Sequence, residues 1–156
     1  MSSDEVQIAL PEERYTLIEY ELQGKPAVAT VNSALVDFAH RDVFRWHLSL
    51  IVDFADLIEN DMPSEAEREV VDAFGDELDD GLKAPPELPN ALFLARMTWN
   101  GTRQLLYRIY DPERANAYLQ SVIAEKKHPR PIDFRMEDEP EWRHAKWFLD
   151  AVSGNG

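Results

Sequence analysis

The 156-residue sequence contains no cysteine. Disulfides, thiolate metal sites and cysteine nucleophiles are therefore excluded, and the absence is typical of proteins from the reducing cytoplasm. The six glycines form no G-x-G-x-x-G or G-K-[ST] phosphate loop. No apolar run approaches the roughly 18 residues of a membrane span, and residues 1–14 are acidic where a signal peptide is apolar. We therefore expect a cytoplasmic protein that does not bind membranes.

Basic residues are few: 16 lysines and arginines stand against 30 aspartates and glutamates, which gives a formal net charge of −14. Such a surface repels the phosphates of nucleic acids and of anionic lipids, so we expect no nucleic-acid partner. The same charge attracts basic proteins, and a basic protein is the partner that it favours. The alternative is that the charge serves solubility alone.

The clearest local pattern is a β-hairpin centred on Asn100-Gly101. Both turn residues tolerate positive φ, and the flanking runs 91–99 and 102–110 have the composition of strands. The elements around this hairpin are, in chain order, a strand at 46–54, a helix at 64–82, a helix at 112–127 and a strand at 131–136. The order of strand, helix, strand, strand, helix, strand is that of the split βαβ arrangement.

Two further elements lie outside this arrangement. Strand patterns at 15–22 and 26–31 indicate a first hairpin, and a terminal helix opens at Pro140. Helices combined with a mostly antiparallel sheet favour two layers. We therefore predict the α+β class, as a ferredoxin-like βαββαβ two-layer sandwich with an extra N-terminal β-hairpin and a C-terminal helix. The predicted limits are a flexible tail at 1–14, a single α+β domain at 15–152 and a flexible tail at 153–156.

The predicted helix 64–82 separates apolar from acidic side chains. Ser64 suits the N-cap, and Glu67 three residues later completes a capping box. The apolar stripe consists of Ala66, Val70, Val71, Phe74, Leu78 and Leu82. The carboxylates expected to face solvent are Glu65, Glu69, Asp72, Asp76 and Asp80. With Trp99 at the hairpin tip they form the predicted partner-binding surface, and packing in the core is the alternative for Trp99.

The histidines do not follow a metal-binding pattern. The chain contains His40, His47, His128 and His144, and none shows H-x-x-x-H or H-E-x-x-H spacing. No cysteine can complete a ligand set. The sequence therefore predicts no metal site and no cofactor.

Two groups contain the residue types of acid–base catalysis. His47, Ser49 and Asp53 share a strand face, but neighbours on a face lie about 6.6–6.8 Å apart along the strand, whereas a base must come within about 2.6–3.2 Å of its nucleophile. A Ser-His-Asp triad is therefore not expected. The Glu-Asp-Glu run at 137–139 is a candidate general acid–base cluster. The alternative is a charged entry to the terminal helix, so no catalytic residue is assigned.

Several motifs resemble the bacterial domain-of-unknown-function family 695. They are Gly24-Lys25-Pro26-Ala27, Trp46-His47-Leu48, Asn100-Gly101, Glu139-Pro140-Glu141-Trp142 and Trp147-Phe148-Leu149. The resemblance covers about residues 15–150 and implies no established activity. The strand order and the acidic Pro-Glu-Trp ending are similar, more distantly, to the B-type protein inhibitor of ribonuclease E. That similarity implies a ferredoxin-like fold and a protein-binding regulator, and it supplies no catalytic residue.

Three functions are therefore compatible with the sequence. The first, which we favour, is an acidic protein-binding or regulatory module without catalytic activity. The second is a cofactor-independent hydrolase that uses His47 or the run 137–139. The third is a structural or oligomer-forming domain. The sequence names neither a partner nor a substrate, and it does not give the oligomeric state.

Overall fold

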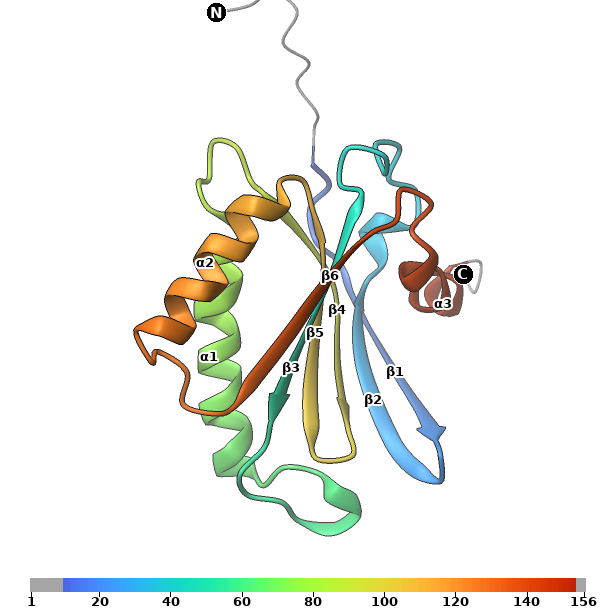
Figure 1. The fold of residues 1–156 in the computed structure, drawn as a ribbon. Helices are drawn as coiled ribbons and strands as arrows, with labels where there is room; N and C mark the ends of the chain where they lie inside the picture. Colours follow the sequence, from blue (N-terminus) through green and yellow to red (C-terminus); the bar gives the residue numbers. More distant parts are fainter. Residues whose placement is uncertain (1–9, 154–156) are drawn as a thin grey trace, which may run out of the picture.

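Residues 10–153 are described by the computed structural model, and across them the chain forms one six-stranded antiparallel sheet and three α-helices (Figure 1). The strands are β1 (Tyr15–Leu22), β2 (Lys25–Asn32), β3 (Trp46–Asp53), β4 (Ala91–Trp99), β5 (Thr102–Ile109) and β6 (Ile132–Asp138). The helices are α1 (Glu65–Lys83), α2 (Pro112–Ala124) and α3 (Arg143–Val152). The order across the sheet is β1-β2-β4-β5-β3-β6. None of the described helices is long and apolar enough to cross a membrane.

The predicted hairpin is confirmed, with Trp99 of β4 opposite Thr102 of β5. Asn100 and Gly101 both have positive φ, at 50° and 78°. These are the conformations that a tight two-residue hairpin turn requires. The turn therefore sets the register of the two central strands.

Helices α1 and α2 cover the same face of the sheet, over β4, β5, β3 and β6 (Figure 1). The alternation of β3 explains this, because Leu48, Leu50 and Val52 all point to that face and are fully buried. They pack in one apolar cluster with residues of both helices, among them Phe74, Leu78, Leu119 and Val122. The prediction that both helices lie on one face is confirmed.

The buried stripe of α1 agrees with the predicted one at Val71, Phe74, Leu78 and Leu82 and differs from it only near the start of the helix. Ala66 and Val70 are exposed, and the buried positions are Glu67, Val71, Phe74, Leu78 and Leu82. The spacings in this set are four, three, four and four, as a period of 3.6 residues demands, whereas a strict repeat of four drifts off the face.

Only half of the predicted capping box forms. Ser64 Oγ accepts a hydrogen bond from the Glu67 backbone N–H at 3.2 Å. The Glu67 carboxylate does not return to Ser64, because it accepts hydrogen bonds from Arg130 Nε and Nη2, both at 2.6 Å. It also accepts one from the Ala55 backbone N–H. Glu67 is thus a buried ion-pair partner that joins α1 to the segment before β6.

Helix α3 lies on the opposite face of the sheet, over β1 and β2 (Figure 1). It begins at Arg143 rather than at the predicted Pro140, because Trp142 has the left-handed φ of 58°. The Trp142 indole is buried and donates to the carbonyls of Arg41 and Phe44 at 2.8 and 3.0 Å. This anchor fixes where α3 crosses the sheet.

The predicted tails, residues 1–14 and 153–156, lie largely outside the described residues. Within the described part of the first tail, Leu10 packs against the apolar cluster beneath α3. Glu13 forms an ion pair with Lys83 at 2.7 Å.

Candidate functional site

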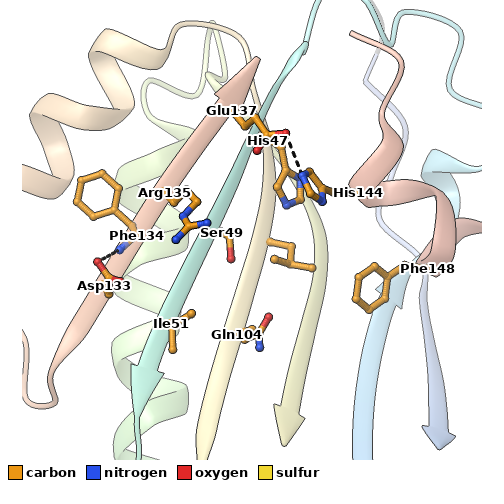
Figure 2. Close-up of a pocket in the computed structure, with 11 residues that line it drawn as sticks. His47, Ser49, Ile51, Gln104, Asp133, Phe134, Arg135, Glu137, His144 and Phe148 are labelled. Carbon is orange, nitrogen blue, oxygen red and sulfur yellow. Dashed lines mark hydrogen bonds and ion pairs between the residues drawn. The ribbon is translucent and has the colours of Figure 1, made fainter. Parts of the chain in front are cut away.

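The part of the sheet face that α3 leaves uncovered forms a groove of about 370 Å³ (Figure 2). The β3 side chains that line it are those that alternate with the core residues, namely His47, Ser49 and Ile51. In the strand register, Ser49 is paired with Leu106 of β5 and with Arg135 of β6. Helix α3 supplies a wall through His144 and Phe148. The groove therefore collects side chains from three strands and one helix.

His47 is the most unusual residue of the groove. It is buried, and its Nδ1 has no hydrogen-bond partner among the described residues. Burial lowers the pKa of His47 to about 3, and the nearby positive charge of Arg108 and the His144 ring act in the same direction. The imidazole is therefore neutral at physiological pH, so one of its two ring nitrogens carries a free lone pair.

A buried ion pair lies beneath this imidazole. Arg108 Nη1 donates to Glu139 Oε1 at 2.6 Å, and both side chains are fully buried. Arg108 also donates to three backbone carbonyls, those of Phe44, Arg45 and Glu139. Burial lowers the pKa of Arg108 to about 10, so the guanidinium stays charged at neutral pH. These four hydrogen bonds offset the cost of burying the charge pair, and they fix the position of the Glu139 carboxylate.

His144 joins the carboxylates to the groove. Its Nε2 lies 3.1 Å from Glu137 Oε2 and 3.6 Å from Glu139 Oε2. Its backbone N–H donates to Glu139 Oε1 at 3.1 Å. Its ring stacks on that of His47, with a centroid distance of 4.7 Å and an interplanar angle of 31°. One imidazole and two carboxylates thus converge, with ligand atoms within 4.8 Å of one another, and they could hold a metal ion.

Three hydrogen-bond donors occupy the rest of the groove. The side chains of Ser49, Gln104 and Arg135 line it (Figure 2). Across residues 10–153, Arg135 has no ion-pair partner, and the side chains of Ser49 and Gln104 make no hydrogen bond. A guanidinium, a hydroxyl and an amide on one sheet face can together bind the oxygens of an anion.

The predicted partner-binding carboxylates lie on α1, on the other side of the sheet from this groove (Figure 1). Four of them, Glu65, Glu69, Asp76 and Asp80, are exposed as expected. Asp72 is different, because Arg103 Nη1 donates to its Oδ1 at 2.6 Å and Arg96 lies 4.0 Å away.

Trp99, the remaining residue of the predicted surface, is only partly exposed. Its Nε1 donates to the carbonyl of Leu22 at 3.0 Å, so it ties the tip of the central hairpin to the tip of the first one. The structure therefore gives Trp99 a bracing contact between hairpins.

Sequence reasoning found part of this groove. It placed His47 and Ser49 on one face of β3 and singled out the run 137–139. It did not bring His144 to these residues, because a left-handed residue at 142 turns the chain between them. The strand register is the signal that connects Arg108 and Glu137 to the groove. His47 is paired with Arg108 on β5 and with Glu137 on β6, so all three belong to the same sheet face.

Comparison with known proteins identifies the family of the chain. Residues 14–149 match a family described as a family of unknown function (DUF695). No curated protein and no solved structure matches the chain. The match confirms the family resemblance found in the sequence, whereas the similarity to the ribonuclease E inhibitor stays a prediction.

Proposed function

Since the chain belongs to the DUF695 family, whose function is unknown, we propose a function from the groove: the protein binds a small anionic molecule that also carries a hydroxyl or amine. The observation that carries this proposal is the free Nδ1 of His47. A buried polar atom without a partner costs about 1–3 kcal/mol. A ligand hydroxyl or amine that forms a hydrogen bond with this nitrogen removes that cost, which makes the site favourable for binding.

The anionic part of the ligand is inferred from the donors of the groove. Arg135 presents a guanidinium without a counter-ion among the described residues, and Ser49 is its partner in the strand register. Guanidinium groups bind carboxylates and phosphates through two parallel hydrogen bonds. The groove volume of about 370 Å³ lies within the range of small-molecule sites.

The net charge of −14 does not by itself exclude an anion from the groove. The exposed carboxylates of α1 lie on the opposite face of the sheet, and salt screens exposed charges beyond about 8 Å at physiological ionic strength. The charged side chains that line the groove are Arg135, Asp133 and Glu137, so we expect the anionic group to bind beside Arg135 and Ser49, away from Glu137.

The test is binding of a panel of small hydroxy acids, amino acids and sugar phosphates, first by thermal shift and then by calorimetry. We expect Arg135→Gln to weaken the binding of any hit by about tenfold or more, because a hydrogen bond to a charged group contributes roughly 1.5–3 kcal/mol. The matched control is Arg68→Gln, which changes an exposed arginine of α1 on the opposite face. Equal affinities for the two variants would reject the proposed groove.

A second candidate is the acidic protein-binding module, acting in the cytoplasm on a basic partner. It is supported by the exposed carboxylates of α1, which are Glu65, Glu69, Asp76 and Asp80. Neutralising these four should slow association with such a partner far more than it speeds dissociation, and salt should have the same effect. The control is a variant with four other exposed carboxylates neutralised, namely Glu12, Glu19, Glu21 and Glu87. Equal association rates for the two variants would reject this surface.

The same proposal includes a ferredoxin-like classification for residues 46–138. It is supported by the order β4-β5-β3-β6 and by the common face of α1 and α2. In this reading β1 and β2 extend the sheet beyond β4, and α3 covers the extension. An experimental structure that can be superposed on known folds of this type tests it, and a different strand order would reject it.

A further inference from the structure

We propose that Glu137, Glu139 and His144 bind a divalent transition-metal ion, with zinc as the reference case, at one end of the groove. The inference rests on the proposed function in one respect, since the open position of the ion would receive the hydroxyl or amine of the bound anion. The three residues come from β6, the turn after it and the start of α3. None of the spacing patterns of known zinc motifs links them in the sequence.

The separations between the ligand atoms fit a metal ion. Ligands at about 2.0–2.1 Å from a tetrahedral zinc ion lie about 3.3 Å from one another. The observed separations from His144 Nε2 are 3.1 Å to Glu137 Oε2 and 3.6 Å to Glu139 Oε2. All the ligand atoms lie within 4.8 Å of one another. The two separations from His144 thus lie within a few tenths of an ångström of the required value, and rotation of the exposed Glu137 side chain can adjust the distance between the two carboxylate oxygens.

An independent observation points to the same place. His47 stacks on His144, its side chain is only 8% exposed, and its Nδ1 has no hydrogen-bond partner among the described residues. This nitrogen lies 3.9 Å from Glu139 Oε1, on the side of the carboxylates. A water or a ligand hydroxyl on the ion would donate to it, which gives the orphan nitrogen a partner. Without an ion, the carboxylates would leave His47 Nδ1 without a partner, because an ionised carboxylate donates no hydrogen bond.

The surroundings of Glu139 resemble the support that metal ligands need. Arg108 holds Oε1 at 2.6 Å, and Oε2 is the oxygen nearer to the His144 ring nitrogen. Outer hydrogen bonds of this kind orient a ligand and raise metal affinity. The arginine makes the cluster less negative, since two carboxylates and one guanidinium leave a single negative charge, which still attracts a cation.

The chemistry of the donors selects the class of ion. Calcium and magnesium prefer oxygen ligands only, whereas an imidazole together with carboxylates suits zinc and its first-row neighbours. Three protein ligands leave one position of a tetrahedral ion open, which is the arrangement of catalytic rather than structural zinc sites. That position would face the groove, because Glu137, His144 and His47 all line it.

The experiment is a calorimetric titration of the full chain with Zn²⁺ after treatment with a chelator and dialysis. We expect one ion per chain, and we expect His144→Ala and Glu137→Gln each to lower the affinity by roughly tenfold or more. Both residues are exposed, so these variants should fold, and circular dichroism checks that they do. The matched controls are His40→Ala and Glu141→Gln, which remove an exposed imidazole and an exposed neighbouring carboxylate outside the cluster. They should bind zinc as the wild type does.

The outcomes separate this inference from the proposed function. No zinc binding by the wild type, or zinc binding that is equal in His144→Ala and His40→Ala, overturns the metal site and leaves the anion titrations as the test of the groove. Zinc binding that His144→Ala weakens supports the metal site even if no anion of the panel binds. Calcium that binds as tightly as zinc overturns the assignment of the ion, since it would indicate an all-oxygen site.

Discussion

Removing either member of the Arg108–Glu139 pair should destabilise the protein strongly, while removing both should cost less than the sum. The two side chains are fully buried and joined at 2.6 Å. Deleting one partner of a buried ion pair costs about 3–5 kcal/mol because the other charge is left uncompensated. In the double variant no unpaired charge remains, so that part of the cost disappears.

The hydrogen bonds of the two side chains determine how much each variant should lose in free energy of unfolding. Arg108→Met removes the donors of three backbone carbonyls as well as the ion pair, so it should lie near the upper end, at about 5 kcal/mol. Glu139→Gln leaves those three hydrogen bonds in place and should cost about 3 kcal/mol. The double variant keeps the loss at the carbonyls but leaves no unpaired charge, so we expect it to cost about 4 kcal/mol, less than Arg108→Met alone, with a coupling energy of about 4 kcal/mol.

Urea unfolding at pH 7, followed by circular dichroism and tryptophan fluorescence, measures all four proteins. Trp142 is a suitable reporter, because the Arg108 guanidinium lies 4.7 Å from the centre of its ring. The control cycle uses Lys146→Met and Asp150→Asn, an exposed i,i+4 pair at 2.8 Å, for which we expect a coupling of at most about 0.5 kcal/mol. Additive free energies at Arg108 and Glu139 would refute the account of the buried pair.

Two further predictions concern α1. Arg130 holds the pKa of Glu67 in the folded protein below its usual value. The ionised carboxylate therefore stabilises the fold fully above the unfolded pKa of about 4.3. This stabilisation is lost as the pH falls through the lower folded pKa. Glu67→Gln should therefore destabilise most at pH 7 and least at pH 3 in urea unfolding, and a constant difference would contradict the ion pair. Gly75→Ala should stabilise by up to about 1 kcal/mol through helix propensity, since the nearest atom to the added Cβ is 4.0 Å away. Gly81→Ala should bring no such gain, because its Cβ would lie 2.0 Å from the Tyr118 ring, and equal melting temperatures for the two variants would contradict this.

The sequence predicted the helices and strands more reliably than it predicted which of their side chains are buried. The hairpin turn at Asn100-Gly101 was found because its backbone conformation is a local property of the two residues. Only the start of the buried stripe of α1 was misjudged, because Glu67 is buried in place of Ala66, and its burial depends on Arg130, which lies 63 positions away. A charged residue can occupy a core position only when such a distant partner is present, and composition within the helix does not reveal it.

The site was predictable only in part, for the same reason. The alternation of β3 places His47 and Ser49 on one face, and that inference is local. The approach of His144 depends on the left-handed turn at Trp142 and on the anchoring of the Trp142 indole beneath the loop 41–44. The burial of Arg108 and Glu139 likewise follows from their pairing across the sheet face. These contacts join segments far apart in the sequence, so periodicity does not indicate them.

The most direct test of the central claim is mapping of ligand binding on the backbone amides by heteronuclear NMR. The protein is titrated with the best anion from the panel, and each perturbed amide is assigned to the groove or to α1. We expect perturbations centred on Ser49, Gln104 and Arg135, with the exposed face of α1 unchanged. Perturbations confined to α1, or the absence of any in the groove at saturating ligand, would contradict it.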